Sequence, residues 1–114
     1  KIILIEGNHD IVAKHHYESL HVEVLERLQI DDFLLTHHPV ETENLFNFCG
    51  HIHPRVVLSG LGKQYLKIPC YFRKQNQLIL PAFGEFTGNY TLKPTPKDKV
   101  YVLTPNEVIE VNLV

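Results

Sequence analysis

The chain has 114 residues, of which 44% are hydrophobic, and its formal net charge is −2. This length and composition suit one small globular domain. The small net charge excludes a long-range attraction of the whole chain to nucleic acid or anionic membranes, so any affinity for an anionic ligand must come from a local site. No apolar run approaches the roughly 20 residues of a membrane-spanning helix, and residues 1–5 are too short for a signal peptide. We therefore expect no membrane partner.

The two cysteines, Cys49 and Cys70, lack the CxxC spacing of redox and zinc motifs. Both lie in apolar, strand-like segments, which favours two reduced core thiols over a disulfide. Reduced thiols agree with the cytosol, and we expect a cytoplasmic protein.

The first half of the chain predicts strands and one helix. Residues 2–5 form a β-branched run typical of a buried parallel strand, and because the chain opens on it we expect a preceding segment. Residues 11–20 predict a short helix. Residues 21–28 show both strand-like alternation and helical spacing, but the turn-forming pair Asp31-Asp32 favours a hairpin with the next strand, residues 33–36.

The second half predicts strands throughout. We expect strands at 46–49 and 56–58, a hairpin of 68–72 with 77–80 around polar residues 73–76, and a hairpin of 100–103 with 108–111. Residues 81–89 are predicted to form a loop, and residues 93–99 a surface connection. The fold class is therefore strand-rich, α+β or α/β.

Three apolar strands end abruptly in polar residues. Asn8 and His9 follow the first strand, His37 follows residues 33–36, and His51 follows residues 46–49. Ligand sites in open α/β sheets form at the carboxyl ends of strands, so these tips converge if their strands are neighbours. Imidazole is a good ligand of zinc, manganese and iron. The pattern indicates a metal site.

The spacing of His51 and His53 suits a site with two metals. On a regular strand the two side chains would face the same side, whereas around a turn they would reach different ions. Gly7 and Gly50, which precede the polar tips, are expected to permit tight turns there. Two metals can clamp a phosphate and lower the pKa of a bridging water, and a histidine that binds neither metal can protonate the leaving group.

These motifs together resemble a known family. GNHD at residues 7–10, His37 after its strand and GHIH at residues 50–53 resemble the second half of the calcineurin-like metallophosphoesterase signature. LTHHP at residues 35–39, CGHIHP at 49–54 and LPAFGEFTG at 80–88 resemble the DNA-ligase-associated subgroup. The resemblance implies the C-terminal half of a four-layer αββα sandwich, in which two mixed sheets are flanked by helices.

The function that the resemblance implies is metal-dependent hydrolysis of phosphate esters by metal-bound hydroxide. The substrate would be a phosphodiester in a nucleotide or at a nucleic-acid end, and a functional link to a DNA ligase is implied. Two divalent ions are expected, manganese first, with zinc or iron as alternatives. Asn8, His37 and His51 would ligate the second ion, and His53 the first.

The resemblance assigns further roles near the metals. His9 would orient the phosphate and protonate the leaving group, and Asp10 would hold the imidazole of His9 in position. Arg55, directly after the GHIH motif, is a candidate contact of the substrate phosphate, although a solvated arginine at a strand edge is an equal alternative.

The family's DxH and GD motifs do not occur in these 114 residues. By resemblance they lie upstream and supply the remaining ligands, so we interpret residues 1–114 as a single partial domain. His53 alone would remain for the first ion and three ligands for the second, fewer than a stable site uses. We therefore expect this chain alone to be inactive, and its first strand to expose apolar surface.

Other interpretations remain open at several residues. A non-catalytic metal-binding or scaffold module would keep the same ligands, whereas a structural zinc site is disfavoured because it would be closed by cysteines. His38 competes with His37 as ligand, and we favour His37 because it directly follows the strand. Phe83 is interpreted as a plug in the core rather than as a lid over the substrate.

Overall fold

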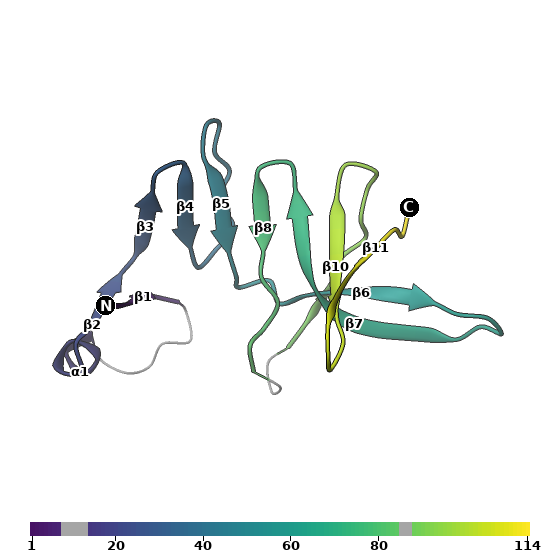
Figure 1. The fold of residues 1–114 in the computed structure, drawn as a ribbon, viewed down its shortest axis with the longest axis horizontal. Helices are drawn as coiled ribbons and strands as arrows, with labels where there is room; N and C mark the ends of the chain where they lie inside the picture. The colour runs from purple at the N-terminus through teal and green to yellow at the C-terminus, as the bar shows by residue number, and fades with distance from the viewer. Residues whose placement is uncertain (8–13, 85–87) are drawn as a thin grey trace.

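The computed structural model describes residues 1–7, 14–84 and 88–114 (Figure 1). A small parallel sheet joins β1 (Ile2–Ile5) to β2 (Val22–Leu25), and the short helix α1 (Lys14–Ser19) precedes β2. Ile2 is 64% exposed and the rest of β1 is half-buried, so the expected exposure of this strand is confirmed at its first residue. Within the described residues, no helix has the length and apolar character needed to cross a membrane.

A larger sheet contains the other strands. β3 (Arg27–Ile30) forms a hairpin with β4 (Phe33–Thr36) across Asp31 and Asp32. The hairpin was expected for residues 21–28, but only residues 27 and 28 belong to it, because β2 pairs with β1 instead. Asp31 has a φ of 51°, a left-handed conformation that Asp tolerates better than most residues. β4 pairs in parallel with β5 (Phe46–Cys49), and β5 pairs in parallel with β8 (Gln77–Ile79). Three parallel strands therefore end at the same edge of the sheet.

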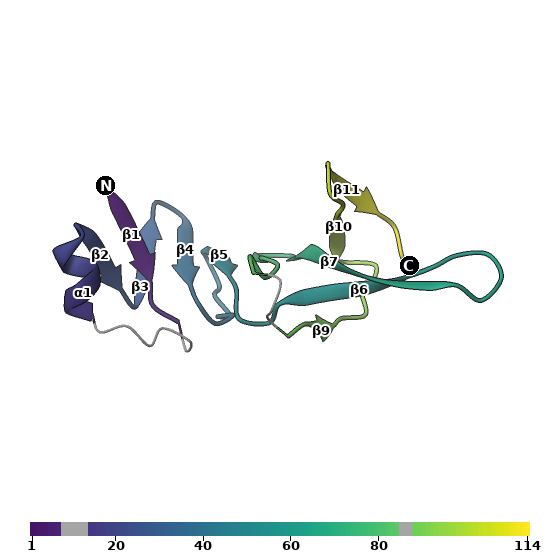
Figure 2. The ribbon, with the colours of Figure 1, turned by 90° about the horizontal axis from the view of Figure 1, so that it is seen from below.

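The ten-residue strand β7 (Tyr65–Lys74) has different partners along its length. Its second half pairs with β8 and with β10 (Lys99–Leu103), which forms the predicted hairpin with β11 (Val108–Val111). Its first half pairs with β6 (Pro54–Ser59), and β6 also pairs with the short β9 (Tyr90–Thr91). The β6–β7 hairpin projects beyond the rest of the sheet (Figures 1 and 2).

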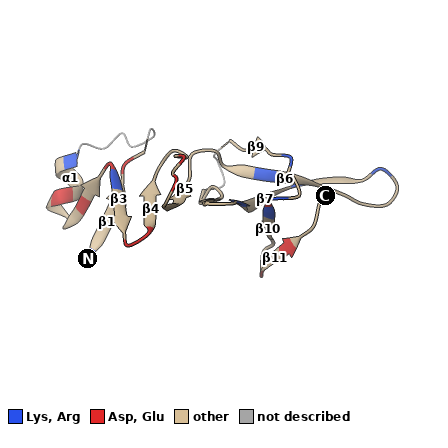
Figure 3. Cartoon of the chain, turned by 90° about the horizontal axis from the view of Figure 1, so that it is seen from above, with Lys and Arg blue, Asp and Glu red and all other residues tan. Residues whose placement is uncertain are grey.

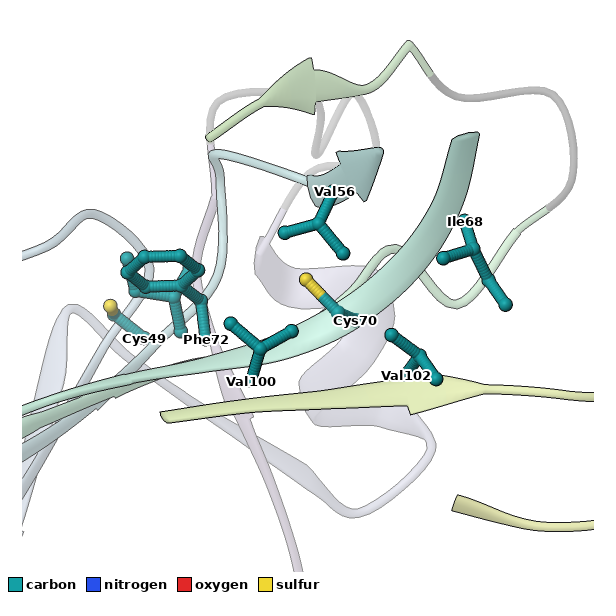
Figure 4. Packing of buried hydrophobic residues seen from close by; sticks show 8 residues of the cluster. Cys49, Val56, Ile68, Cys70, Phe72, Val100 and Val102 are labelled. Atoms are coloured by element: carbon teal, nitrogen blue, oxygen red, sulfur yellow. The ribbon is translucent and has the colours of Figure 1, made fainter. Parts of the chain in front are cut away.

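The hydrophobic core lies where β6, β7 and β10 meet. Val56 and Cys70 are fully buried and face one another in this cluster (Figure 4). The buried cluster consists of Cys49, Val56, Ile68, Cys70, Phe72, Ile79, Val100 and Val102. On the opposite face of the sheet, aromatic residues such as Phe46, Phe48 and Tyr71 are only half-buried and line a hollow of about 520 Å³.

The molecule is extended, with the β6–β7 hairpin projecting at one end and α1, β1 and β2 at the other (Figure 1). The radius of gyration is 16.1 Å, whereas a compact chain of this length has about 13 Å. The strand-rich α+β class expected from the sequence is confirmed. One expectation is wrong: Phe83 is fully exposed, so it is not a core plug. The sequence signals at residues 81–84 are those of a loop, and nothing in the described structure covers this ring.

Both cysteines are free and buried, as predicted. Burial raises the pKa of each thiol from 9.0 to about 11, because the thiolate is poorly solvated in the core.

We predict that neither thiol of the folded chain reacts readily with Ellman's reagent at pH 8. The thiolate is the reactive form, and the raised pKa keeps both groups protonated there. Absorbance of the released thionitrobenzoate measures the reaction. Unfolding in urea should release two fast-reacting thiols, and a fast phase in the native protein would contradict the burial of the cysteine that reacts.

Candidate metal centre

The ends of the parallel strands bring two of the predicted ligands together. β4 ends immediately before His37, and β5 ends immediately before Gly50 and His51. The Gly50 amide donates a 2.9 Å hydrogen bond to the His37 carbonyl, which extends the pairing of the two strands by one step. His37 and His51 are thereby held side by side at the carboxyl edge of the sheet, where the sequence predicted convergence.

The spacing of the ring nitrogens is that of two ligands sharing one ion. Nε2 of His37 lies 3.3 Å from Nδ1 of His51. Two nitrogens bound at about 2.0–2.1 Å to one tetrahedral zinc would lie about 3.3–3.4 Å apart. The spacing therefore fits two ligands of one ion, and without an ion it is also that of an N–H···N hydrogen bond between the two rings.

His38 belongs to the same cluster. Ligand atoms of His37, His38 and His51 all lie within 4.8 Å of one another, so the three side chains could hold a metal ion. The His38 ring is exposed, and its centroid is 4.1 Å from that of His51. The preference for His37 over His38 stays a prediction; sequence reasoning missed that both rings face His51, although the paired histidines in HHP were a visible signal.

The backbone around the GHIH motif differs from the expected one. The residues with left-handed backbone are His51, with φ of 67°, and His53, with φ of 53°, rather than Gly50 or Gly7. Gly7 is needed for a different reason: a Cβ there would lie 2.7 Å from two atoms of the His37 ring. The end of β1 thus packs directly against the candidate ligand, and a side chain at residue 7 would displace it.

His53 lies apart from the three-histidine cluster. Its Nδ1 is 2.7 Å from the Gly88 carbonyl, and its own carbonyl accepts a hydrogen bond from the Tyr90 amide. Because a carbonyl only accepts, Nδ1 carries the proton, and in the neutral ring the lone pair is then on Nε2. A backbone carbonyl on one ring nitrogen and a metal on the other is the usual arrangement of ligating histidines.

The remaining predicted site residues are only partly placed. Asn8, His9 and Asp10 lie outside the described residues. Arg55 is half-buried, and its Nε donates a 2.7 Å hydrogen bond to the Thr91 hydroxyl, which ties β6 to β9.

A buried polar network supports the turn that carries His37 and His38. Asn47 of β5 is fully buried, and its Nδ2 donates to the Leu34 carbonyl at 2.9 Å and to the Thr36 hydroxyl at 3.0 Å. Its Oδ1 accepts from the Val40 amide at 3.1 Å and from Nε2 of Gln77 at 3.0 Å. All four hydrogen-bonding positions of this amide are therefore used.

The same network reaches the histidine turn at both ends. The Thr36 hydroxyl donates to the His38 carbonyl, and Nε2 of Gln77 lies 3.3 Å from the Val40 carbonyl. Hydrogen bonds from side chains of β4, β5 and β8 therefore hold the turn that contains His37, His38 and Pro39. Sequence reasoning did not single out Asn47 or Gln77, although a polar residue inside an apolar strand is a usable signal.

Comparison with known proteins shows a likeness to a solved nuclease structure. No family model and no curated protein matches the chain. Its structure is similar to the crystal structure of the nuclease MPE of Pseudomonas putida, with a TM-score of 0.79 and 33% sequence identity over 97% of this chain. The chain shares its fold with a nuclease. It spans 54% of that protein, about half its length, which agrees with the expected half of a larger sandwich.

We predict that Asn47→Ala lowers the free energy of unfolding by about 2–4 kcal/mol, because it leaves several buried polar groups without a partner. Urea unfolding followed by circular dichroism measures this change. Asn76→Ala is the matched control: its amide donates to the Thr42 carbonyl at the surface, and the loss should be below about 1 kcal/mol. Equal losses in the two variants would contradict the role given to the buried network.

We also predict that Gly7→Ala weakens zinc binding by the chain on the order of tenfold, because the new methyl group displaces the His37 ring. Isothermal titration calorimetry measures the affinity, and far-ultraviolet circular dichroism checks the fold. Gly50→Ala is the control, since its nearest contact would be an ordinary 3.8 Å from the His37 carbonyl. If both variants bind zinc like the unchanged chain, the close approach of Gly7 does not position His37.

Proposed function

We propose that the chain is part of a metal-dependent phosphodiesterase that acts on nucleic acid or nucleotides. The observation that carries this proposal is the 3.3 Å spacing of Nε2 of His37 and Nδ1 of His51 at the ends of parallel strands, in a chain with the fold of a nuclease. The fold alone would not support an activity, because one fold hosts many functions. The ligand geometry at the strand ends supplies the missing argument.

The residues of the chain divide between holding metal and handling the substrate. His37 and His51 would hold one divalent ion, with His38 or Asn8 as a further ligand, and His53 would contribute Nε2 to a second ion. When bound, such ions polarise a phosphoryl oxygen and lower the pKa of water. Mn²⁺ is the ion we propose first, with Zn²⁺ or Fe²⁺ as alternatives.

The protein groups proposed to act on the substrate lie beside these ligands in the sequence. His9 would orient the phosphate and protonate the leaving oxygen, and Asp10 would hold the His9 imidazole in position. Arg55 offers a charged donor to a phosphate oxygen. The GNHD motif supports the first two roles, and the position of Arg55 two residues after His53 supports the third.

We further propose that residues 1–114 do not turn over substrate by themselves. Three histidines in one cluster and a separate His53 provide fewer ligands than a two-metal centre uses. The DxH and GD motifs that the resemblance implies are not among these residues. The wider assignment, a partial domain of a cytoplasmic enzyme linked to a DNA ligase, rests on the same motifs and on the two reduced cysteines.

Metal binding by the 114-residue chain tests the proposal. We expect calorimetry to show binding of Mn²⁺ or Zn²⁺ that His37→Ala and His51→Gly each weaken at least about tenfold. Glycine is chosen at residue 51 because the backbone there is left-handed. His15→Ala, an exposed histidine on α1, is the matched control and should bind like the unchanged chain. Binding that depends equally on His15 would reject the centre.

Two further measurements separate a phosphoesterase from a metal-binding scaffold. The metal-loaded chain should bind inorganic phosphate, and the His51→Gly variant should not; a metal-loaded chain that ignores phosphate indicates a scaffold. The chain alone should not hydrolyse bis(p-nitrophenyl) phosphate with Mn²⁺. Turnover above the His51→Gly background would contradict the proposed inactivity while supporting the phosphodiesterase.

A further inference from the structure

The charges of the chain are strongly segregated along the sequence. Residues 45–84 contain no Asp or Glu, although the whole chain has 13. The basic residues of this segment are Arg55, Lys63, Lys67, Arg73 and Lys74. The net charge of −2 therefore conceals a segment of forty residues with only positive charges, and this segment contains the projecting β6–β7 hairpin.

The paired part of the hairpin, β6 with residues 65–69 of β7, carries its basic side chains on one face. Opposite residues of paired strands share a face, and so do alternate residues of one strand. Arg55 pairs with Pro69, Val57 with Lys67, and Ser59 with Tyr65, so Arg55, Lys67 and Tyr65 lie on the same face. Lys63 lies in the turn beyond them.

That face is turned away from the hydrophobic core. Val56 and Ile68, on the other face, are buried in the core cluster, whereas Lys63 and Lys67 are exposed and Tyr65 is 72% exposed. Within the described residues neither lysine has an acidic partner. Figure 3 shows Lys and Arg on the hairpin and its turn, while the acidic residues gather mainly on the other half of the molecule.

The basic face begins next to the candidate metal centre. Arg55 is two residues from His53, and β6 runs from that point outward to the turn. A ligand lying along Arg55, Lys67, Tyr65 and Lys63 would therefore have one end beside His53. An exposed tyrosine between two cations adds a ring on which a base can stack, which is how single-stranded nucleic acid is bound without sequence preference.

We propose that this face of the β6–β7 hairpin binds a single-stranded nucleic acid and leads it to the histidine cluster. The proposal rests on the proposed phosphodiesterase function for its choice of polyanion. It deepens that function, because it assigns a polynucleotide rather than a mononucleotide as the substrate. The lysines contact phosphates and Tyr65 stacks on a base.

The test is binding of a fluorescein-labelled oligothymidylate to the 114-residue chain, followed by anisotropy in the presence of EDTA. We expect Lys63→Gln/Lys67→Gln to weaken binding on the order of tenfold at low salt. The slope of log affinity against log salt should become shallower by about 1.4, since each phosphate contact of a single strand contributes about 0.7. Tyr65→Ser should weaken binding about fivefold or more without changing the slope.

Lys97→Gln/Lys99→Gln is the matched control. It removes the same charge from exposed lysines outside the hairpin and should bind like the unchanged chain. Equal losses in the two double variants would overturn the proposal, and so would an unchanged chain that does not bind the oligonucleotide. Displacement by polyglutamate as effectively as by unlabelled oligonucleotide would also overturn it, in favour of an acidic protein partner.

The EDTA separates this result from the metal centre. In EDTA the unchanged chain should bind the oligonucleotide as tightly as it does with added Mn²⁺, because the hairpin does not depend on a bound ion. Binding that appears only with added Mn²⁺ would move the nucleic-acid site from the hairpin to the histidines. If metal binding fails while the hairpin variants behave as expected, the proposed phosphodiesterase is rejected and the nucleic-acid surface remains.

Discussion

A single buried amide, that of Asn47, satisfies polar groups from three adjacent strands at once. Leu34, Asn47 and Gln77 stand in one row across β4, β5 and β8, and the amide of Asn47 joins the row to the turn above it. In an apolar interior an unsatisfied amide is costly, whereas a fully satisfied one fixes a single arrangement. The alignment of the strand ends follows from it, and with that alignment the positions of His37 and His51.

The candidate centre is supported on two sides by backbone rather than by side chains. The Gly50 amide bonds to the His37 carbonyl, and Gly7 approaches the His37 ring so closely that no side chain fits between them. His53 is oriented separately by the Gly88 carbonyl. The contacting groups are main-chain atoms, so no second side chain has to be immobilised to orient the ring. This favours ligands that are already in position before an ion binds.

The strands could be predicted from the sequence, and so could the meeting of His37 with His51. Apolar runs ending in a polar residue define strand ends well, and parallel neighbours bring such ends together. The long β6–β7 hairpin could not be foreseen, because its turn around Gly62 and Lys63 carries few strand signals and its outer half buries little. Nor could the crowding at Gly7, which depends on the packing of β1 against a distant turn.

Several features of the site could be predicted only in part from the sequence. The spacing of His51 and His53 left open whether they stand on a regular strand or around a turn. The structure has a bend at residues 51–52, and the left-handed backbone is at the two histidines and not at the neighbouring glycines. Phe83 was misjudged because hydrophobicity alone does not reveal whether a partner surface exists. The aromatic face of the sheet shows the same limit of hydrophobicity as a guide to burial. Its residues have the hydrophobicity of core residues but are only half-buried.

The left-handed backbone at residues 51 and 53 makes histidine less favourable for stability than glycine at both positions. Each such residue other than glycine costs roughly 1 kcal/mol, so glycine at either place would suit the fold better than histidine does. If substitutions were selected only for stable folding, they would tend to replace both histidines. The fold alone therefore does not explain histidine at these two positions, and its presence there accords with the ligand roles proposed for the two imidazoles.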